Sequence, residues 1–225
     1  MVNLKKFAII VAGGVGTRMN AGIPKQFLLL GGKPVLMHSM EAFALAYPDI
    51  SIILVLPASQ FSSWQSLCEQ HLFTLPHQVV AGGETRFHSV KNALSAIGSD
   101  GVVAIHDGVR PLISVSLIRE GFLSAGQLGN CIPVVPVNES LRMLENGGSH
   151  AVGRSEFCMV QTPQVFRCNI IKKAYEQAYR ESFTDDATVA ESIGEVIHLI
   201  DGDPVNLKIT HPSDLAAAEA IFRSV

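Results

Sequence analysis

The chain has 225 residues, 48% of them hydrophobic, and this size predicts one folded domain with a full core. The formal net charge is only −3 and no block of like charges occurs, so a general nucleic-acid-binding surface is not expected. No apolar run approaches the roughly 18 residues of a membrane-spanning helix. We therefore expect a soluble protein, without a nucleic-acid or membrane partner, that acts on a small molecule.

The N-terminal segment and the cysteines are typical of a cytoplasmic protein. The apolar run at residues 7–12 is too short for an export signal. The four cysteines form no CxxC pair and have no nearby histidine at the spacing of a zinc site. We interpret them as reduced thiols, which suits the cytoplasm.

Up to residue 137, short apolar segments rich in β-branched residues alternate with segments of helical spacing. Strands are predicted at residues 7–11, 50–56, 78–80, 102–105 and 131–137. Helices are predicted after Pro34, from Phe61 to Cys68 and from Phe87 to Ile97. This alternation, with continuous apolar strands, is typical of an α/β fold with a mostly parallel sheet and helices on both faces.

Residues 138–160 break this pattern. Their periodicity is weak, and a Gly147-Gly148 turn separates two short segments that could pair as a hairpin. We interpret them as a protruding β-arm rather than a second domain, so that residues 1–225 form a single domain.

Three further elements are predicted after the arm. A helix is predicted at residues 169–180, and another from Thr184, with two acidic residues in its first turn where they suit the helix dipole. The last segment predicts a strand from Val205 and then a helix that begins near Pro212.

Polar segments follow three of the predicted strands, at residues 12–18, 81–86 and 106–111. Ligands of open α/β sheets bind outside the carboxyl ends of the strands. We therefore expect these segments to meet in one binding site.

The first segment combines glycines with two cations. Gly13, Gly14 and Gly16 follow a strand, so backbone N–H groups can approach a phosphate chain. A dinucleotide-binding fingerprint is disfavoured because its third glycine is missing, and a P-loop because Lys25 comes nine residues after Gly16. With Arg18 supplying a second charge, a triphosphate is the favoured ligand. A glycine turn with two solvated cations remains the alternative.

The second segment places Gly82 and Gly83 at a strand end, followed by Arg86 and Ser89. Arg86 and Ser89 are one turn apart if a helix begins near Thr85. A flat base could lie over the glycines and hydrogen-bond to the backbone and to Ser89. A glycine pair before a helix is common, so this segment alone is weak evidence.

In the third segment, Asp107 follows an apolar strand and Arg110 lies three residues further on. A carboxylate there is costly unless it binds a ribose hydroxyl, a metal ion or a cation. A salt-bridged loop is the alternative. Three such segments at one edge of the sheet together favour a nucleotide site.

These segments, in this order, resemble the 2-C-methyl-D-erythritol 4-phosphate cytidylyltransferases of the non-mevalonate isoprenoid pathway. The resemblance covers about residues 7–222. The first loop is shared by many sugar-phosphate nucleotidyltransferases, whereas the full set of motifs is much narrower. The motifs lie at residues 13–19 with 24–26, 82–83 with 86 and 89, 106–111, 162–164 and 206–210.

The resemblance implies a Rossmann-like fold of the nucleotide-diphospho-sugar transferase type. It also implies that CMP is transferred from CTP to 2-C-methyl-D-erythritol 4-phosphate, giving 4-diphosphocytidyl-2-C-methyl-D-erythritol and pyrophosphate, with Mg²⁺ held mainly on the CTP phosphates. Because the attacking phosphate is already an anion, this chemistry needs positioning and charge stabilisation rather than a protein nucleophile or base.

The resemblance also implies a role for each residue that matches a family motif. The implied catalytic residues are Arg18, Lys25, Lys208 and Asp107. Asp107 is also the candidate protein ligand of the metal ion. The implied nucleotide-binding residues are Ala12, Gly13, Gly14, Gly16, Gly82, Gly83 and Ser89. The implied contacts to the acceptor substrate are Arg110, Ser140, Arg154 and Thr162.

In the family, the segment that corresponds to about residues 138–160 crosses to a second subunit. The resemblance therefore implies a homodimer with exchanged arms and composite active sites. This chain departs from the family pattern in the arm, where Glu139-Ser140 replace Asp-Thr and Gly153 replaces an aspartate. Serine keeps the hydroxyl, so the role of Ser140 is retained.

Two other functions remain open from the sequence. Ribitol-5-phosphate cytidylyltransferases share nearly every nucleotide motif, and their acceptor is also a polyol phosphate. A catalytically silent nucleotide-binding protein is the alternative from another class. The presence of Arg18, Lys25, Asp107 and Lys208 weighs against the silent protein.

Overall fold

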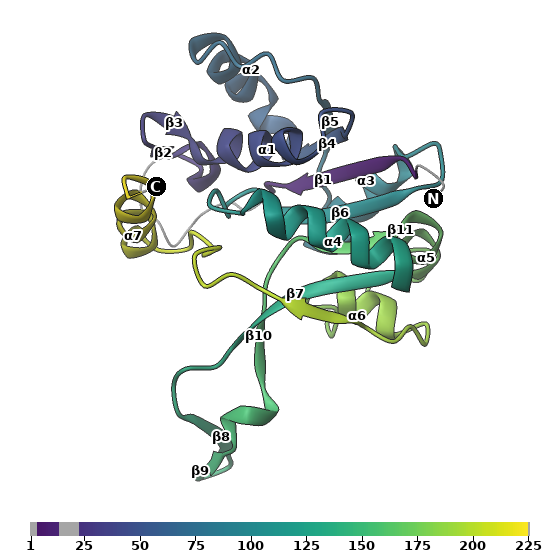
Figure 1. Ribbon diagram of the computed structural model, residues 1–225, viewed down its shortest axis with the longest axis vertical. Coiled ribbons are helices and arrows are strands. Elements are labelled where there is room, and N and C mark those ends of the chain that lie inside the picture. Colours follow the sequence, from purple (N-terminus) through teal and green to yellow (C-terminus); the bar gives the residue numbers. More distant parts are fainter. Residues whose placement is uncertain (1–3, 14–22, 225) are drawn as a thin grey trace.

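The computed structural model describes residues 4–13 and 23–224. Its centre is an 8-stranded sheet with the strand order β10-β7-β11-β6-β1-β4-β5, in which β12 also pairs with β7 (Figure 1). The sheet contains β1 (Lys6–Val11), β4 (Ser51–Leu56), β5 (Gln78–Ala81), β6 (Val102–Asp107), β7 (Asn130–Pro136), β10 (Cys158–Val160), β11 (Gln164–Arg167) and β12 (Leu199–Asp201). Three predicted residues, Gly14, Gly16 and Arg18, lie outside the described part of the chain.

The half of the sheet that carries the predicted site is parallel. β1 pairs in parallel with β4 and β6, and β4 pairs in parallel with β5. β11 runs antiparallel between β6 and β7. The prediction of a mostly parallel sheet is confirmed, and the carboxyl ends of β1, β5 and β6 meet at one edge.

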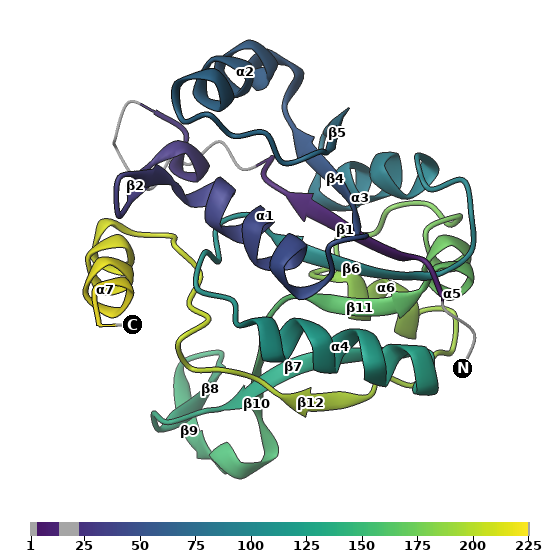
Figure 2. The ribbon, with the colours of Figure 1, turned by 45° about the horizontal axis from the view of Figure 1, so that its top comes forward.

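Helices cover both faces of the sheet, as predicted (Figure 2). Alternate residues of β1 point to opposite faces, so Ala8 and Ile10 join one hydrophobic core, and Phe7 and Ile9 join the other. The first core includes side chains from α1 (Val35–Ala46), α2 (Phe61–Gln70) and α4 (Val115–Leu128). The second includes side chains from α3 (Arg86–Ser95), α5 (Cys168–Ala174) and α6 (Asp186–Glu191).

The C-terminal helix α7 (Pro212–Phe222) begins at Pro212, as predicted. It contacts the small β2 (Leu29–Leu30) and β3 (Lys33–Pro34) ribbon, and the Gly31 N–H donates to Glu219 Oε1 at 2.9 Å. A third core, which includes Leu30, Ile209 and Ala218, lies between them. This packing holds in place the segment before α7, which carries Lys208.

Three predictions from the pattern were wrong in detail. No strand forms from Val205, because Asp203 Oδ1 accepts from the Val205 N–H at 2.9 Å and the Asp203 carbonyl accepts from the Asn206 N–H, which makes a turn. The helix predicted at 169–180 ends at Ala174, where the Gln177 side chain donates to the Ala174 carbonyl at 2.8 Å. The helix predicted from Thr184 begins at Asp186, with Asp185 as its N-cap.

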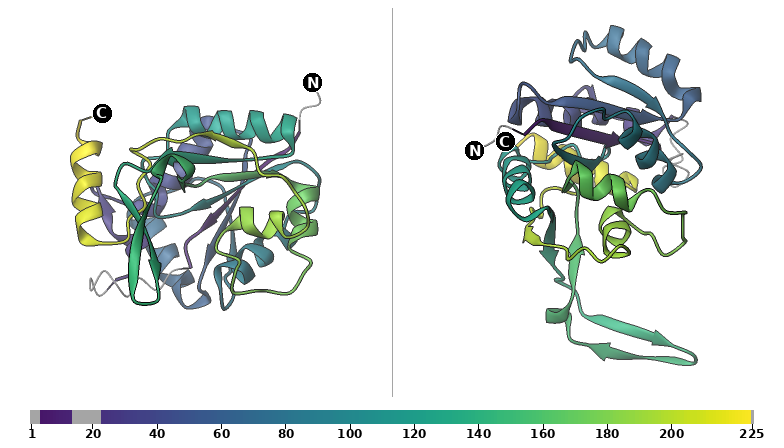
Figure 3. Two further views of the ribbon diagram at one scale, coloured as in Figure 1. Left: turned by 90° about the horizontal axis from the view of Figure 1, so that it is seen from below. Right: turned by 90° about the vertical axis from the view of Figure 1, so that its right-hand side faces the viewer.

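Within the predicted arm of residues 138–160, residues 141–152 form a hairpin, whereas residues 158–160 join the central sheet as β10. β8 (Leu141–Glu145) and β9 (Gly148–Val152) pair only with each other, and Gly147 has the positive φ of 90° that the turn requires. The hairpin extends far from the body of the chain (Figure 3). A short 3-10 helix, Arg154–Glu156, leads back to β10. In the described part of the chain, no helix is both long and apolar enough to cross a membrane.

Candidate active site

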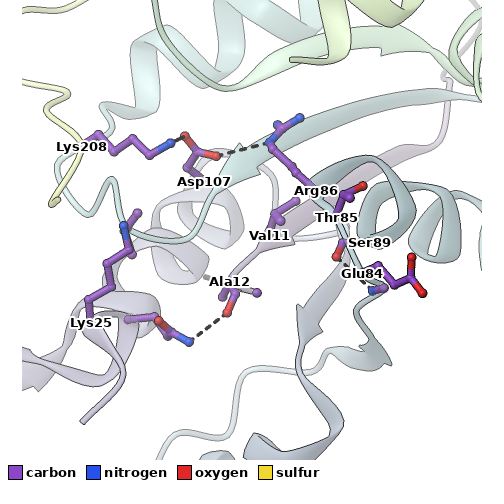
Figure 4. Close-up of a pocket in the computed structure, with 13 residues that line it drawn as sticks. Val11, Ala12, Lys25, Glu84, Thr85, Arg86, Ser89, Asp107 and Lys208 are labelled. Carbon is purple, nitrogen blue, oxygen red and sulfur yellow. Dashed lines mark hydrogen bonds and ion pairs between the residues drawn. The ribbon is translucent and has the colours of Figure 1, made fainter. Parts of the chain in front are cut away.

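A pocket of about 230 Å³ lies at the carboxyl ends of β1 and β6 (Figure 4). Residues from all three predicted polar segments line it. They are joined by residues from the turn around Lys25 and from the segment before α7. The lining residues are Val11, Ala12, Gly13, Lys25, Gln26, Gly83, Glu84, Thr85, Arg86, Ser89, Asp107, Val109 and Lys208. The sheet topology therefore brings together segments that lie far apart in the sequence.

The Asp107 carboxylate is the electrostatic centre of this pocket. Its Oδ2 lies 3.0 Å from Lys208 Nζ and 3.5 Å from Arg110 Nε, and its Oδ1 lies 3.8 Å from Arg86 Nε. Burial raises the pKa of Asp107, but the charges of Arg86, Lys208 and Arg110 outweigh it and hold the pKa well below its usual value. The group is therefore an anion at neutral pH, surrounded by cations.

A buried network fixes the backbone beneath Asp107. The Asp107 N–H donates to Thr162 Oγ1 at 3.0 Å, and Thr162 Oγ1 lies 3.1 Å from His106 Nδ1. Burial lowers the pKa of His106 to about 4, so the imidazole is neutral at pH 7. Its Nε2 faces the Arg110 carbonyl at 3.3 Å, which can only accept, so Nε2 carries the proton and Nδ1 accepts from the Thr162 hydroxyl. His106 is thus a positioning group, not a base.

The Gly82-Gly83 turn is held by the first turn of α3. Thr85 caps this helix, as expected, and Ser89 Oγ accepts from the Gly83 N–H at 3.1 Å. A Cβ on Gly83 would lie 2.4 Å from His88 Cβ, so a side chain there would clash. The Ser89 hydroxyl proton has no acceptor among the described residues, which leaves it able to donate to a base. Gly83 and Ser89 line the pocket, whereas Gly82 lies just behind it.

Lys25 belongs to a short 3-10 helix, Lys25–Phe27, that is tied to the end of β1. Its Nζ donates to the Ile209 carbonyl at 3.2 Å, next to Lys208 in the chain. The neighbouring Gln26 is only 1% exposed, and its Nε2 donates to the Ala12 carbonyl at 2.9 Å and to Gln60 Oε1 at 2.7 Å. Gln26 therefore anchors Lys25 beside the first glycine segment. Sequence reasoning gave Gln26 no role, although it belongs to a motif.

The four predicted acceptor contacts lie outside the pocket. Arg110 and Thr162 are buried beside it, and the Arg110 guanidinium also donates to the Asn206 carbonyl at 2.7 Å. Ser140 and Arg154 are exposed on the arm, where Arg154 donates to the Asn138 carbonyl. Within one chain, the predicted catalytic and nucleotide-binding residues that are described come together, and the arm residues remain apart from them.

The donor set fits a magnesium ion that is carried mainly by the substrate. No cluster of three or more His, Cys, Asp or Glu side chains with the arrangement of a metal site occurs among the described residues. Asp107 and Glu84 are the carboxylates that line the pocket. Mg²⁺ is usually bound by one or two carboxylates together with substrate phosphates, so Asp107 would suffice as the protein ligand.

Comparison with known proteins places the chain in a family. The sequence model of the 2-C-methyl-D-erythritol 4-phosphate cytidylyltransferases matches residues 7–224. The chain belongs to this family. A cytidylyltransferase of this name from Bacteroides thetaiotaomicron is 50% identical over 219 residues, which are 97% of this chain and 100% of the relative. One from Geobacillus kaustophilus is 39% identical and covers 96% of each chain.

Solved structures of the family share the fold. The 4-diphosphocytidyl-2C-methyl-D-erythritol synthase of Anaerococcus prevotii aligns with a TM-score of 0.83 at 25% identity, covering 98% of this chain and 96% of the other. The 2-C-methyl-D-erythritol 4-phosphate cytidylyltransferase of Thermus thermophilus aligns with a TM-score of 0.75 at 28% identity, covering 96% and 98%. The predicted Rossmann-like nucleotidyltransferase fold is confirmed, and the chain is an enzyme of the cytidylyltransferase family.

Proposed function

We propose that this chain transfers CMP from CTP to 2-C-methyl-D-erythritol 4-phosphate in the pocket around Asp107, yielding 4-diphosphocytidyl-2-C-methyl-D-erythritol and pyrophosphate. The main support is that Lys25, Lys208 and Asp107 share one pocket with the Gly83–Ser89 turn, in a member of this family. Membership of the family favours this acceptor over ribitol 5-phosphate and an active enzyme over a silent protein.

The cations act on the triphosphate. In phosphoryl transfer, negative charge is spread over the transferred group and the leaving pyrophosphate, and fixed positive charges stabilise it. Lys25 and Lys208 supply two ammonium groups from opposite ends of the sequence, and the Lys25 ammonium donates to the carbonyl of Ile209, the residue that follows Lys208. Arg18 is proposed as a third, on the resemblance alone. The attacking atom is a phosphate oxygen of the acceptor, so no residue needs to remove a proton.

Lys208 is able to exchange its partner when the substrate binds. Its side chain is 42% exposed, whereas that of Asp107 is 11% exposed. The Lys208 ammonium is accessible to a phosphate group, and the buried Asp107 carboxylate is not left unpaired when the ammonium moves. Arg110 and Arg86 remain beside Asp107 after this exchange, and Asp107 is then free to accept from a ribose hydroxyl or bind the metal ion. When bound, Mg²⁺ would neutralise part of the triphosphate charge.

The Gly83–Ser89 turn is proposed to select cytosine. The Ser89 hydroxyl and backbone carbonyls of the turn can present a donor and acceptors to the edge of a base, since the Gly82 and Gly83 N–H groups already donate to the Leu56 carbonyl and to Ser89 Oγ. A site built from hydrogen bonds to one base discriminates strongly, because a wrong base leaves buried polar groups unpaired. Ala12 and Gly13 line the pocket on the side expected for the phosphates.

The arm is proposed to complete the acceptor site of a second subunit. Ser140 and Arg154 project from a segment that has little contact with its own chain, and large apolar side chains near them are exposed: Leu144 at 83%, Phe157 at 44% and Met159 at 49%. Clustered exposed apolar side chains mark protein interfaces. A homodimer with exchanged arms would bury them and bring Ser140 and Arg154 to the partner's pocket, where Arg110 and Thr162 would lie on the acceptor side. The four free cysteines suit a cytoplasmic enzyme.

The proposal is tested by measuring pyrophosphate release from CTP and Mg²⁺ with each acceptor in turn. We expect rapid release with 2-C-methyl-D-erythritol 4-phosphate and much slower release with ribitol 5-phosphate. The reverse preference would reassign the acceptor. No release with either acceptor, from protein that is folded by circular dichroism, would support the silent alternative.

A further inference from the structure

Asp186 is a fully buried carboxylate with an exposed fraction of 0%. A buried charge is costly unless it is paired and hydrogen-bonded. Asp186 Oδ1 accepts from Arg86 Nη1 at 2.9 Å and from the Tyr175 hydroxyl at 2.7 Å, and Oδ2 accepts from Arg86 Nη2 at 2.6 Å. This two-pronged arrangement is the strongest geometry for an arginine and a carboxylate, and it fixes the plane of the Arg86 guanidinium.

The N-terminal turn of α6 holds Asp186 in place. Asp185 caps the helix and forms a capping box with Thr188. Gln164 of β11 clamps the same turn, because its Nε2 donates to Asp185 Oδ2 at 2.7 Å and its Oε1 accepts from the Ala187 N–H at 2.9 Å. The position of the carboxylate is thus set by the sheet itself, and Arg86 is tied to a rigid support.

The third guanidinium nitrogen of Arg86, Nε, faces the Asp107 carboxylate. With both Nη atoms held by Asp186, Nε lies 3.8 Å from Asp107 Oδ1 (Figure 4). Lys208 and Arg110 contact the other oxygen, Oδ2. The two oxygens of Asp107 are therefore held from different sides. If Lys208 moves to a phosphate, Arg86 still constrains Oδ1.

Arg86 also begins the helix that reads the base. It is the first residue of α3, directly after the Thr85 cap, and Ser89 lies one turn further along. The contact with Asp186 therefore fixes the start of α3 and holds the Arg86 guanidinium beside the Asp107 carboxylate. One side chain links the base-reading turn to the carboxylate at the centre of the pocket.

We propose that Arg86 is a positioning residue for CMP transfer, anchored by Asp186 and Tyr175, and that it orients the Asp107 carboxylate relative to the base-reading turn. This inference rests on the proposed function. The simpler alternative is an ion pair that only stabilises the packing of α3 against α6. The two differ in whether folded protein with an altered Arg86 loses turnover.

The test uses Arg86→Lys, which keeps the charge but loses the planar fork. Groups that orient a metal-binding side chain are typically worth roughly 10- to 100-fold in metal affinity or activity, and we take the same scale for the group that orients Asp107. We expect kcat per folded molecule to fall by this factor, with a much smaller change in KM for CTP. Arg119→Lys is the matched control, since Arg119 Nε donates to the Ala46 carbonyl at the end of α1 and Arg119 does not line the pocket. Its kcat should equal that of the wild type.

A double-mutant cycle with Asp107→Asn decides whether Arg86 acts through Asp107. Coupled residues give effects that do not add. We expect Arg86→Lys to have little further effect on kcat in the Asp107→Asn background. Tyr175→Phe removes one hydrogen bond to Asp186 and keeps both contacts from Arg86, so it should lower kcat less than Arg86→Lys.

The outcomes separate this inference from the proposed function. If the wild type does not turn over CTP with either acceptor, the proposed function fails. If the wild type is active and Arg86→Lys loses only thermal stability, with kcat per folded molecule unchanged, Arg86 is structural and the inference is overturned. Fully additive effects of the two substitutions would overturn it as well. If Asp107→Asn is too slow to measure, the kcat of Arg86→Lys per folded molecule decides alone.

Discussion

Two contacts between a side-chain nitrogen and a carboxylate oxygen in this chain have the same length but belong to very different regions. Lys208 Nζ lies 3.0 Å from Asp107 Oδ2 in the pocket, and His150 Nδ1 lies 3.0 Å from Glu145 Oε1 on the arm. The side chain of Asp107 is 11% exposed, whereas that of Glu145 is 61% exposed. The distance between the atoms therefore says little about the role of a pair, and the surroundings say more.

The pocket around Asp107 and the hairpin on the arm differ in how many contacts with the rest of the chain hold them in place. Around Asp107, further cations and a buried network with Thr162 and His106 fix the carboxylate within one chain. The hairpin of β8 and β9 is a separate two-stranded sheet with exposed side chains. A pocket that is organised within one chain is suited to binding CTP, and the hairpin is the region to which we assign a role only as part of the proposed function.

The largest expected effect comes from removing a charge at the pocket. Loss of one donor that stabilises transition-state charge typically costs about 100- to 1000-fold in kcat. We expect Lys25→Ala and Lys208→Ala each to lose activity on this scale while the free energy of unfolding changes by about 1 kcal/mol or less. Steady-state kinetics and urea unfolding on the same samples measure both. A loss of stability that matches the loss of activity would make Lys25 a structural residue.

The arm gives the next prediction, which tests whether each site combines two chains. Arg154→Ala should lower kcat with the acceptor by roughly 10- to 100-fold, on the scale of a lost substrate contact to a charged group. Mixing it with Lys25→Ala after dissociation and reassociation should restore about one quarter of wild-type activity. The reason is that half of the randomly formed dimers are mixed, and each mixed dimer has one site with both residues intact.

The mixing experiment distinguishes an arm that reaches the pocket of the partner subunit from an arm that serves the pocket of its own chain, because the two arrangements predict different activities for the mixed dimer. If Arg154 served the pocket of its own chain, every site in a mixed dimer would lack either Lys25 or Arg154, and no activity would return. If the chain remained a monomer by sedimentation, the crossing arm itself would be rejected.

The parallel half of the fold could be predicted because a buried strand is visible in the sequence as a short continuous run of apolar residues. The apolar runs that became β1, β4 and β6 needed no knowledge of their neighbours. Helix α4 was not predicted, although Ser114 caps its start and Gly129 follows its end, because its apolar spacing is diluted by exposed leucines. β12 was also missed, since a short edge strand is defined by its partner β7 and hardly by its own residues.

A site residue could be predicted from the sequence where its residue type is rarely found in that local setting. It could not be predicted where its role depends on contacts with residues far away in the sequence. Asp107 after an apolar strand indicated a paired carboxylate before the pairs were known. The anchoring of Arg86 could not be predicted, because Asp186 is 100 residues away in the sequence. The same holds for Gln26, whose partners Ala12 and Gln60 belong to other elements.

The smallest expected effect is a change in the free energy of unfolding at acidic pH. It is tested by comparing His106, which is buried beside the pocket, with His150, which is exposed on the arm. Burial lowers the pKa of His106 to about 4 from a normal value of 6.5. Below pH 6.5 the unfolded chain therefore binds a proton that the folded chain does not bind. The contribution of neutral His106 to stability is present above that pH and is lost as the pH falls towards 4. We expect this residue alone to cost the wild type about 2 kcal/mol of unfolding free energy between pH 7 and pH 5.

The measurement is urea unfolding at both pH values, without CTP or metal ions, on the wild type, His106→Asn and His150→Asn. His106→Asn should be less stable at pH 7, because hydrogen bonds to Thr162 and Arg110 are weakened, but it should lose about 2 kcal/mol less than the wild type on acidification. His150→Asn, on the exposed hairpin, should keep the acid response of the wild type. This pH window lies above the range in which carboxylates titrate, so the paired groups around Asp107 contribute little to the difference. An unchanged acid response in His106→Asn would show that the folded imidazole has the same pKa as in the unfolded chain and is protonated at pH 5. The hydrogen-bond directions beneath Asp107 would then have to be reversed, since a charged His106 donates to the Thr162 hydroxyl rather than accepting from it.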